Sequence, residues 1–297
     1  MMQLRHAGAN PRRWLRNAGL TAIVAAALCI VGYHWRTHAR GVGPQRYVSL
    51  SPAITETLVA LGVGAELVGV SDYCVYPKQV ERLPHVGSGF TPRYESIMTL
   101  SPTLVFVESV NAPNVETLGR VVRVEALPWL TLKQVIRSTR RLGQLTGRAG
   151  PAEELAVNYE LRLRPRLTEN SPRVLLVMAH SPGEMHEVIF IRRNSIHGRV
   201  LEAAGARNAV GEDINGAPRL SLEQVIRLDP DGVVILQSAQ NVDNRILDDW
   251  RKLTVLRAVK TNHINIIAAP EVAIPGPRLV DLVEQMASVI GAWTKAA

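Results

Sequence analysis

The sequence is built around one stretch that occurs twice, first as Tyr94-Glu95-Ser96-Ile97-Met98-Thr99-Leu100-Ser101-Pro102-Thr103-Leu104-Val105-Phe106-Val107 and again as Leu222-Glu223-Gln224-Val225-Ile226-Arg227-Leu228-Asp229-Pro230-Asp231-Gly232-Val233-Val234-Ile235. In both copies a Glu is followed by an apolar pair, a Leu, a Pro and an apolar run at the same spacing. Two distant copies exclude a solenoid. The repeat predicts two similar lobes, each with the same helix, turn and strand and each with one Glu at the same place.

Short apolar runs alternate with helical stretches on both sides of the repeat. Strands are expected at Tyr47–Leu50, Leu67–Val70, Leu104–Val107, Val121–Val124, Val174–Met178, Val233–Leu236 and Ile264–Ile267. Helices are expected at Ile54–Leu61, after Thr91-Pro92, at Leu132–Leu145, at Ile196–Ala204, after Ser221 and at Arg278–Trp293. Such alternation predicts an α/β fold with two Rossmann-like lobes and parallel sheets.

A charged and strongly helical stretch lies at mid-chain, between the two copies of the repeat. Pro151–Leu167 contains three Glu and three Arg residues and has no strand pattern. A single helix that joins two lobes has this composition. We therefore expect an N-terminal lobe at 46–148, one long connecting helix at 149–169 and a C-terminal lobe at 170–297.

The basic charge of the chain is concentrated at its N-terminus. The net charge is +8, yet residues 1–46 contain seven Arg and no Lys, Asp or Glu. The rest of the chain is therefore nearly neutral. This distribution gives no sign of nucleic-acid binding by the folded part.

Residues 1–45 are predicted to be a basic N-terminus, a membrane segment and a linker. The uncharged run Ala18–Tyr33 follows three Arg residues, which is typical of a signal sequence or a membrane anchor. Tyr33 and Trp35 extend the segment to 18–35, because aromatic residues favour the membrane interface. We favour an uncleaved single anchor in the cytoplasmic membrane, with the folded domain on the periplasmic or extracellular side. Cleavage near Ala39 and lipidation of Cys29 remain alternatives.

The sequence shows no signature of covalent catalysis. It contains no G-x-S-x-G, H-E-x-x-H, Walker or dinucleotide-binding motif. His180, His186 and His197 occur without Cys or carboxylates at metal-ligand spacing, and nothing around Cys74 indicates a reactive thiol. We therefore expect no enzyme activity, no cofactor and no metal site. His180 is a weak ligand-binding candidate, because it follows a strand, and open α/β sheets bind ligands at the carboxyl ends of their strands.

Several segments together resemble the substrate-binding proteins of ABC importers for vitamin B12 and ferric siderophores. The resemblance covers roughly Arg46 to Ala292. It rests on Arg46-Tyr47-Val48-Ser49-Leu50-Ser51-Pro52-Ala53-Ile54-Thr55-Glu56, Val70-Ser71-Asp72-Tyr73-Cys74-Val75-Tyr76-Pro77, the first copy of the repeat from Glu95, Leu201-Glu202-Ala203-Ala204-Gly205-Ala206-Arg207-Asn208 and Pro275-Gly276-Pro277-Arg278.

The resemblance implies two lobes bridged by one rigid helix, a ligand in the cleft between them and a permease dimer as partner. In this family a Glu on each lobe docks on arginines of the permease, and the matching positions are Glu95 and Glu223. Without the resemblance, both are also explained as acids that stabilise a helix N-terminus. The expected ligand contacts lie in the matching loops, among neighbouring aromatic residues and at the strand end: Ser51, Asp72, Tyr73, Phe90, Trp129, His180, Glu271 and Arg278.

The cargo is expected to be a corrinoid or a similar metal chelate. Val107, Met178 and Ala217 stand where cobalamin binders place stacking aromatics, which weakens the case for cobalamin itself. Ferric siderophore and haem are alternative ligands. An anchored sensory or scaffold module without transport is an alternative from a different class. A metal-dependent enzyme on this fold is a further one, but it needs a converging cluster of metal ligands that the spacing does not suggest.

Overall fold

The fold is given by a computed structural model that describes residues 44–212 and 218–295. The chain from Arg46 to Ala297 forms one compact unit. The expected membrane segment at 18–35 lies outside the described residues. Among the helices that are described, none is both long enough and apolar enough to cross a bilayer.

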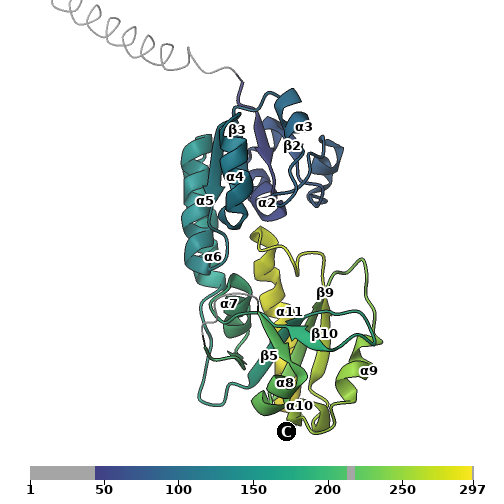
Figure 1. Cartoon of the computed structure of the whole chain (residues 1–297). Helices are drawn as coiled ribbons and strands as arrows, with labels where there is room; N and C mark the ends of the chain where they lie inside the picture. Colours follow the sequence, from purple (N-terminus) through teal and green to yellow (C-terminus); the bar gives the residue numbers. More distant parts are fainter. Residues whose placement is uncertain (1–43, 213–217, 296–297) are drawn as a thin grey trace, which may run out of the picture. The chain divides into compact units, whose positions relative to one another are not determined.

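The N-terminal lobe is a four-stranded parallel sheet with helices around it (Figure 1). Its strand order is β2-β1-β3-β4, and every neighbouring pair is parallel. The strands are β1 (Tyr47–Ser49), β2 (Leu67–Val70), β3 (Leu104–Glu108) and β4 (Val124–Leu127), and the helices include α2 (Pro52–Ala60), α3 (Tyr94–Thr99) and α4 (Ala112–Gly119). The predicted parallel architecture is confirmed for this lobe.

The C-terminal lobe has a second parallel sheet of four strands in the order β10-β9-β5-β7. Its strands are β5 (Arg173–Met178), β7 (Arg207–Asn208), β9 (Gly232–Gln237) and β10 (Ile264–Ala268). A small antiparallel pair, β6 (Glu187–Ile189) with β8 (Arg219–Ser221), was not predicted. The helices are α7 (Ile196–Ala203), α8 (Leu222–Leu228), α9 (Ile246–Arg251), α10 (Arg257–Lys260) and α11 (Leu282–Lys295).

The sequence repeat forms the same structure in both lobes. The first copy is α3 followed by β3, and the second is α8 followed by β9. The turns also agree in detail, because Ser101 and Asp229 occupy equivalent positions directly before a Pro and both have a positive φ, of 45° and 37°. This backbone conformation is uncommon for residues other than Gly. The repeat is therefore structural, as expected.

Two long helices form a hairpin on one flank of the N-terminal lobe (Figure 1). Helix α5 (Leu132–Thr146) begins with a capping box made by Thr131 and Gln134, and it ends at Gly147 in the left-handed conformation. Helix α6 (Ala149–Arg162) packs along α5 and leads towards the C-terminal lobe. The helix expected at 149–169 therefore starts where predicted but ends seven residues early, before Pro165.

Both sheets are buried on both faces, and one core joins the lobes. Alternate residues of a strand point to opposite faces. In β5, Val174 and Leu176 belong to a large cluster that also contains Tyr47 and Phe106 of the N-terminal lobe, whereas Leu175 packs in a cluster confined to the C-terminal lobe. A continuous apolar core across two lobes favours a small hinge motion over a wide opening.

Three local predictions are wrong at their boundaries. The strand expected at Val121–Val124 lies at Val124–Leu127, because residues 120–122 form the end of the turn after α4. Thr91 does not cap α3; the N-cap residue is Arg93, and it has no side-chain cap. The last helix is divided into a 3₁₀ turn at Pro277–Asp281 and α11.

Candidate ligand-binding site

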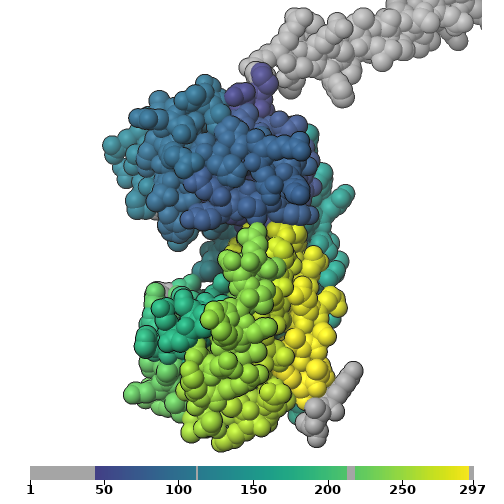
Figure 2. Space-filling model, turned by 90° about the vertical axis from the view of Figure 1, so that its right-hand side faces the viewer, coloured from purple at the N-terminus to yellow at the C-terminus, as the bar shows by residue number. Residues whose placement is uncertain are grey.

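A hollow of about 540 Å³ lies between the two lobes. We call it the inter-lobe hollow, and Figure 2 shows the surface indented between the blue N-terminal lobe and the green C-terminal lobe. Its lining residues come from both lobes: Glu108, Ser109, Val110, Pro128, Trp129, Leu130, Gln134, Arg192, Ser195, Ile196, His197, Ala273 and Pro275. This volume is in the range of sites for small organic ligands.

The walls of the inter-lobe hollow are built at the carboxyl ends of parallel strands. Glu108 is the last residue of β3, and Pro128 and Trp129 directly follow β4. On the other side, Ala273 and Pro275 lie in the segment after β10. Ligands of open parallel sheets bind at these ends. In both sheets the carboxyl ends of the strands, where a ligand is expected to bind, thus lie at the inter-lobe hollow.

Glu108 is the acidic group of the inter-lobe hollow. Its Oε1 accepts a hydrogen bond of 2.6 Å from Ser51 Oγ, and Ser51 itself is buried at the N-terminus of α2. Burial raises the pKa of the Glu108 carboxyl, and the bond from Ser51 offsets part of that rise. Glu108 therefore has a greater tendency than an exposed Glu to carry a proton.

The opposite wall is fixed by the start of α7. Ser195 caps this helix by accepting from Gly198 N at 3.0 Å, and its Oγ donates to the carbonyl of Arg192 at 2.7 Å. A Cβ at Gly198 would lie 2.4 Å from the carbonyl oxygens of Arg192 and Arg193, so only Gly allows this close turn. The cap and the glycine together place Arg192 at the hollow.

His197 also lines the inter-lobe hollow but is neutral. Its Nε2 lies 2.9 Å from the carbonyl oxygen of Val272. A carbonyl only accepts, so Nε2 carries the proton in this tautomer. Burial lowers the pKa of His197 to about 4, although the bond to Val272 favours the charged form. This histidine joins two segments of the C-terminal lobe and contributes no charge near neutral pH.

Trp129 is the one expected ligand-binding residue that lines the inter-lobe hollow among the described residues. Its ring is buried, and its Nε1 donates to the carbonyl oxygen of Pro275 at 2.8 Å. Next to it, Ile196 N donates to the carbonyl oxygen of Leu130 at 2.8 Å. Both bonds join the N-terminal lobe to the C-terminal lobe. Trp129 is therefore also part of the inter-lobe connection.

Arg278 and Glu271 lie in a buried ionic cluster that connects the lobes. The Arg278 guanidinium pairs with Glu56 of α2, with Nε–Oε2 at 3.0 Å, and with Glu271 at 3.3 Å. It also stacks over the ring of Tyr76, 3.8 Å from the ring centroid. Burial disfavours the charge, but the two carboxylates raise the pKa of Arg278. The N–H donors of Arg278 are thus directed at the carboxylates of Glu56 and Glu271, and a ligand would have to compete with these two residues for them.

The loop after β2 contains the other expected contacts. Asp72 pairs with Arg93 at 2.8 Å and accepts from Gly87 N at 3.1 Å. Desolvation opposes its charge, yet these bonds hold the pKa of Asp72 below its usual value. Tyr73 and Phe90 are 69% and 72% exposed. These two aromatic rings remain available to a ligand, whereas Asp72 fixes the loop.

The side chains of His180 and Cys74 both contact other side chains of the protein. His180 Nε2 lies 3.3 Å from Asp249, which also pairs with Lys252 at 2.9 Å and accepts from Gly183 N at 2.7 Å. The bond from Lys252, followed by that from Gly183, lowers the pKa of Asp249 to about 2. The Cys74 thiol is buried beside Thr55, and burial raises its pKa, so it is a poor nucleophile.

The two Glu residues of the repeat lie at equivalent, exposed places. Glu95 is in the first turn of α3 and Glu223 in the first turn of α8. Neither side chain has a hydrogen bond or ion pair with another described residue. Elsewhere in the described chain, no three His, Cys, Asp or Glu side chains are grouped to hold a metal ion.

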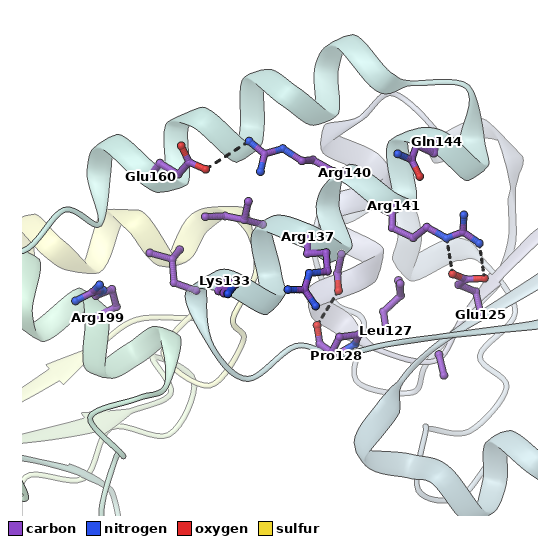
Figure 3. Close-up of a pocket in the computed structure, with 14 residues that line it drawn as sticks. Glu125, Leu127, Pro128, Lys133, Arg137, Arg140, Arg141, Gln144, Glu160 and Arg199 are labelled. Carbon is purple, nitrogen blue, oxygen red and sulfur yellow. Dashed lines mark hydrogen bonds and ion pairs between the residues drawn. The ribbon is translucent and has the colours of Figure 1, made fainter. Parts of the chain in front are cut away.

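A larger hollow, of about 720 Å³, adjoins the inter-lobe hollow at Pro128, which lines both (Figure 3). It runs along α5 beside the edge strand β4 and has both Glu160 of α6 and Arg199 of α7 in its lining. We call it the α5 groove. Its lining holds more basic than acidic side chains and does not include any of the expected ligand contacts.

Glu108, Arg192 and Ser195 were not named from the sequence, and His197 was named only among histidines without metal-ligand spacing. The sequence does contain a sign that Glu108 belongs to the site, because Glu108 directly follows the apolar run Leu104–Val107, just as His180 follows a predicted strand. The same strand-end rule selects both residues. The strand-end rule does not select Arg192, Ser195 or His197, because these residues lie just before and in the first turn of α7.

Comparison with known proteins gives a consistent result. The periplasmic binding protein family matches residues 48–270. The vitamin B12-binding protein of Vibrio cholerae is 26% identical over 256 residues, which cover 83% of this chain and 89% of that protein. An ABC transporter substrate-binding lipoprotein of Bacillus subtilis is 25% identical over 260 residues, with coverage of 83% and 80%.

The solved structures agree with the sequence comparison. A periplasmic haem-binding protein from Pseudomonas aeruginosa superposes with a TM-score of 0.66 at 27% identity, over 86% of this chain and 94% of that one. The resemblance stated from the sequence is thereby confirmed, together with the two-lobed α/β fold.

Proposed function

Because the chain belongs to the periplasmic binding protein family, we propose that it captures a corrinoid or similar metal chelate in the inter-lobe hollow and delivers it to an ABC importer. The family is one of substrate-binding proteins rather than of enzymes. The observation that carries the proposal is a hollow lined by both lobes at the carboxyl ends of their strands.

The chemistry of the inter-lobe hollow suits a large ligand with an apolar body and polar substituents. Trp129, Leu130 and Ile196 supply apolar surface, Glu108 supplies a carboxyl group, and Arg192 supplies a guanidinium cation. The exposed rings of Tyr73 and Phe90 are proposed as further contacts. Corrinoids and haem both combine an apolar macrocycle with amide or carboxylate side groups.

Haem is the second candidate ligand. The similarity to the Pseudomonas aeruginosa haem-binding protein, at 27% identity, favours it as much as the vitamin B12-binding relative favours a corrinoid. A corrinoid carries neutral amides, which accept a hydrogen bond from a protonated carboxyl. A protonated carboxyl donates equally to a haem propionate, so the raised pKa of Glu108 fits both ligands.

We propose that Glu95 and Glu223 dock the two lobes onto a permease dimer. Both carboxylates are exposed, lack partners in the described chain and occupy equivalent places on the repeat. Bidentate pairing with Arg is strong and directional, so two such contacts would orient the protein on a two-fold partner. An anchored sensory or scaffold module would not need both.

The chain is further proposed to be held at the membrane by residues 18–35, with the compact unit on the outer side of the cytoplasmic membrane. This proposal rests on the sequence of that segment. Intact-mass measurement of the protein from the membrane fraction tests it, because retention, cleavage and lipidation of Cys29 give three different masses.

Calorimetric titration of residues 46–297 with cyanocobalamin, cobinamide, haem and a ferric siderophore tests the ligand. We expect binding of at least one corrinoid, and weaker binding after Glu108→Lys, which places a cation where the acid was. Haem binding without corrinoid binding would support the second candidate. Failure of all four to bind would favour the sensory module.

Charge reversal at both docking residues tests the partner. The double variant Glu95→Lys and Glu223→Lys is expected to abolish uptake in cells while leaving the ligand affinity of the purified protein unchanged. Glu154→Lys with Glu169→Lys is the matched control, since both of these residues are also exposed. Uptake that survives the first double variant would contradict the docking role.

A further inference from the structure

We propose that the α5 groove is a second ligand site, which binds a small amphipathic anion with an apolar body and one carboxylate or phosphate group. Apart from Pro128, which lines both hollows, the lining residues of this site differ from those of the inter-lobe hollow, and the proposal does not depend on the proposed transport function. It rests on the charges, the apolar floor and the size of the groove.

The α5 groove has an excess of basic side chains. Five cations line it against two carboxylates, and these cations are Lys133, Arg137, Arg140, Arg141 and Arg199. Both carboxylates are already engaged: Arg141 pairs with Glu125 at 2.6 Å, and Arg140 pairs with Glu160 at 3.4 Å (Figure 3). The acids of the groove are therefore used by two of its arginines.

Lys133 and Arg137 have no anionic partner in the part of the chain that the structure describes. In Figure 3 no dashed line joins either side chain to another residue of the groove, in contrast to Arg140 and Arg141. Lys133, Arg137 and Arg141 are four residues apart, so they lie on one face of α5. Like charges at this spacing repel each other, and a bound anion between Lys133 and Arg137 would relieve the repulsion.

The floor of the groove is apolar. Leu127 at the end of β4, Leu132 at the start of α5 and Ile136 one turn later all line it. Leu127 and Ile136 are 2% and 8% exposed, so they form a continuous surface with the core. A simple inorganic anion would not use this floor, whereas a ligand with an aromatic or aliphatic body would.

The size and composition of the groove select a small molecule. A volume of about 720 Å³ lies within the range of sites for small organic ligands. Arg199 adds a cation from α7 of the C-terminal lobe, although it already pairs with Glu202. The strongest attraction for the acid group is therefore expected at Lys133 and Arg137, with the body of the ligand over Leu132 and Ile136.

Titration with four small probes tests the proposal. Residues 46–297 contain all three apolar clusters of the described chain, so this fragment keeps its complete core. The probes are 2-naphthoate, 1-naphthyl phosphate, the neutral 2-naphthamide and inorganic phosphate. We expect both naphthyl anions to bind at least about tenfold more tightly than 2-naphthamide and inorganic phosphate, because only they combine a body with a charge.

Methyl-labelled NMR spectra show where the probes bind. Ile136 lines the α5 groove, whereas Ile196 lines the inter-lobe hollow. The naphthyl anions are expected to shift the δ1 methyl signal of Ile136 and to leave that of Ile196 unchanged. The two anions also distinguish a carboxylate ligand from a phosphate ligand by their relative affinity.

Two double variants distinguish binding in the α5 groove from a general effect of the net charge of the protein. Lys133→Gln with Arg137→Gln is expected to weaken binding of both naphthyl anions at least about tenfold. Lys78→Gln with Arg82→Gln removes the same charge at the same spacing from another exposed turn, and it should leave the affinity unchanged. The proposal would be overturned if neither naphthyl anion bound, or if 2-naphthamide bound as tightly as the anions. It would also be overturned if Lys133→Gln with Arg137→Gln left the affinity for the anions unchanged, or if the signal of Ile196 shifted instead of that of Ile136.

Discussion

Arg278 is predicted to hold the two lobes together rather than to select the ligand. Its guanidinium lies between Glu56 and Glu271, whose side chains are only 3% and 10% exposed. Replacement by Gln removes the charge and leaves two buried carboxylates without their cation. Breaking a buried ion pair from one side costs about 3–5 kcal/mol.

This cost is large enough to measure in the unfolding of the domain. For a chain of this size, about 1 kcal/mol shifts the melting temperature by about 2–4 °C, so Arg278→Gln should lower it by at least about 6 °C. The assay is thermal and urea unfolding of residues 46–297 at neutral pH. Arg120→Gln is the control, because Arg120 pairs with Glu116 on the exposed surface and should not change the midpoint.

A compensated variant makes the argument stricter. When Glu56→Gln and Glu271→Gln are added to Arg278→Gln, no carboxylate of this ionic cluster remains without a cation, and part of the lost stability should return. An Arg278→Gln protein that is as stable as the wild type but binds its ligand much more weakly would refute the reasoning. Arg278 would then be a ligand contact, as the sequence suggested.

Three further outcomes are expected from the contacts of the site. Trp129→Phe removes the Nε1–H bond to Pro275 and should lower the unfolding free energy by about 1 kcal/mol, as measured in urea; no change would show that this bond is not needed between the lobes. The pKa of His197 is about 4 in the folded protein and 6.5 ordinarily, so between pH 6.5 and pH 4 this residue binds more protons in the unfolded chain than in the folded one. The unfolding free energy should therefore fall by about 3 kcal/mol as the pH is lowered from 6.5 to 4. His197→Gln should remove this part of the fall. Ser51→Ala removes the hydrogen bond to Glu108 and should raise the pKa of that carboxyl further, which an NMR titration of its side-chain carbon would show; an unchanged pKa would mean that the bond is absent in solution.

The architecture of the lobes follows from patterns that the sequence shows directly. Alternating apolar runs predict the parallel strands, and the repeat predicts equivalent units around β3 and β9. The ends of helices and strands follow less directly from the sequence, because capping contacts and turn hydrogen bonds decide them. Arg93 replaces Thr91 as the N-cap of α3, and the strand after α4 starts at Val124, three residues after the expected start.

The site is harder to predict because it depends on contacts between distant segments. Trp129 and Pro275 are 146 residues apart, and Arg278 and Glu56 are 222 apart. No local pattern shows that an Arg is already paired. The sequence therefore treats Arg278 and Glu271 as free ligand groups, whereas the structure places them in one ionic cluster and brings the unselected Glu108 to the inter-lobe hollow.

The most direct test of the account is the position of a bound chelate. Residues 46–297 with labelled isoleucine methyls are saturated with whichever of the four chelates binds most tightly, and the spectra of free and bound protein are compared. We expect a shift of the δ1 methyl signal of Ile196, which lines the inter-lobe hollow, and no shift of that of Ile136. A bound chelate that leaves Ile196 unchanged would contradict the assignment of the hollow as the ligand site.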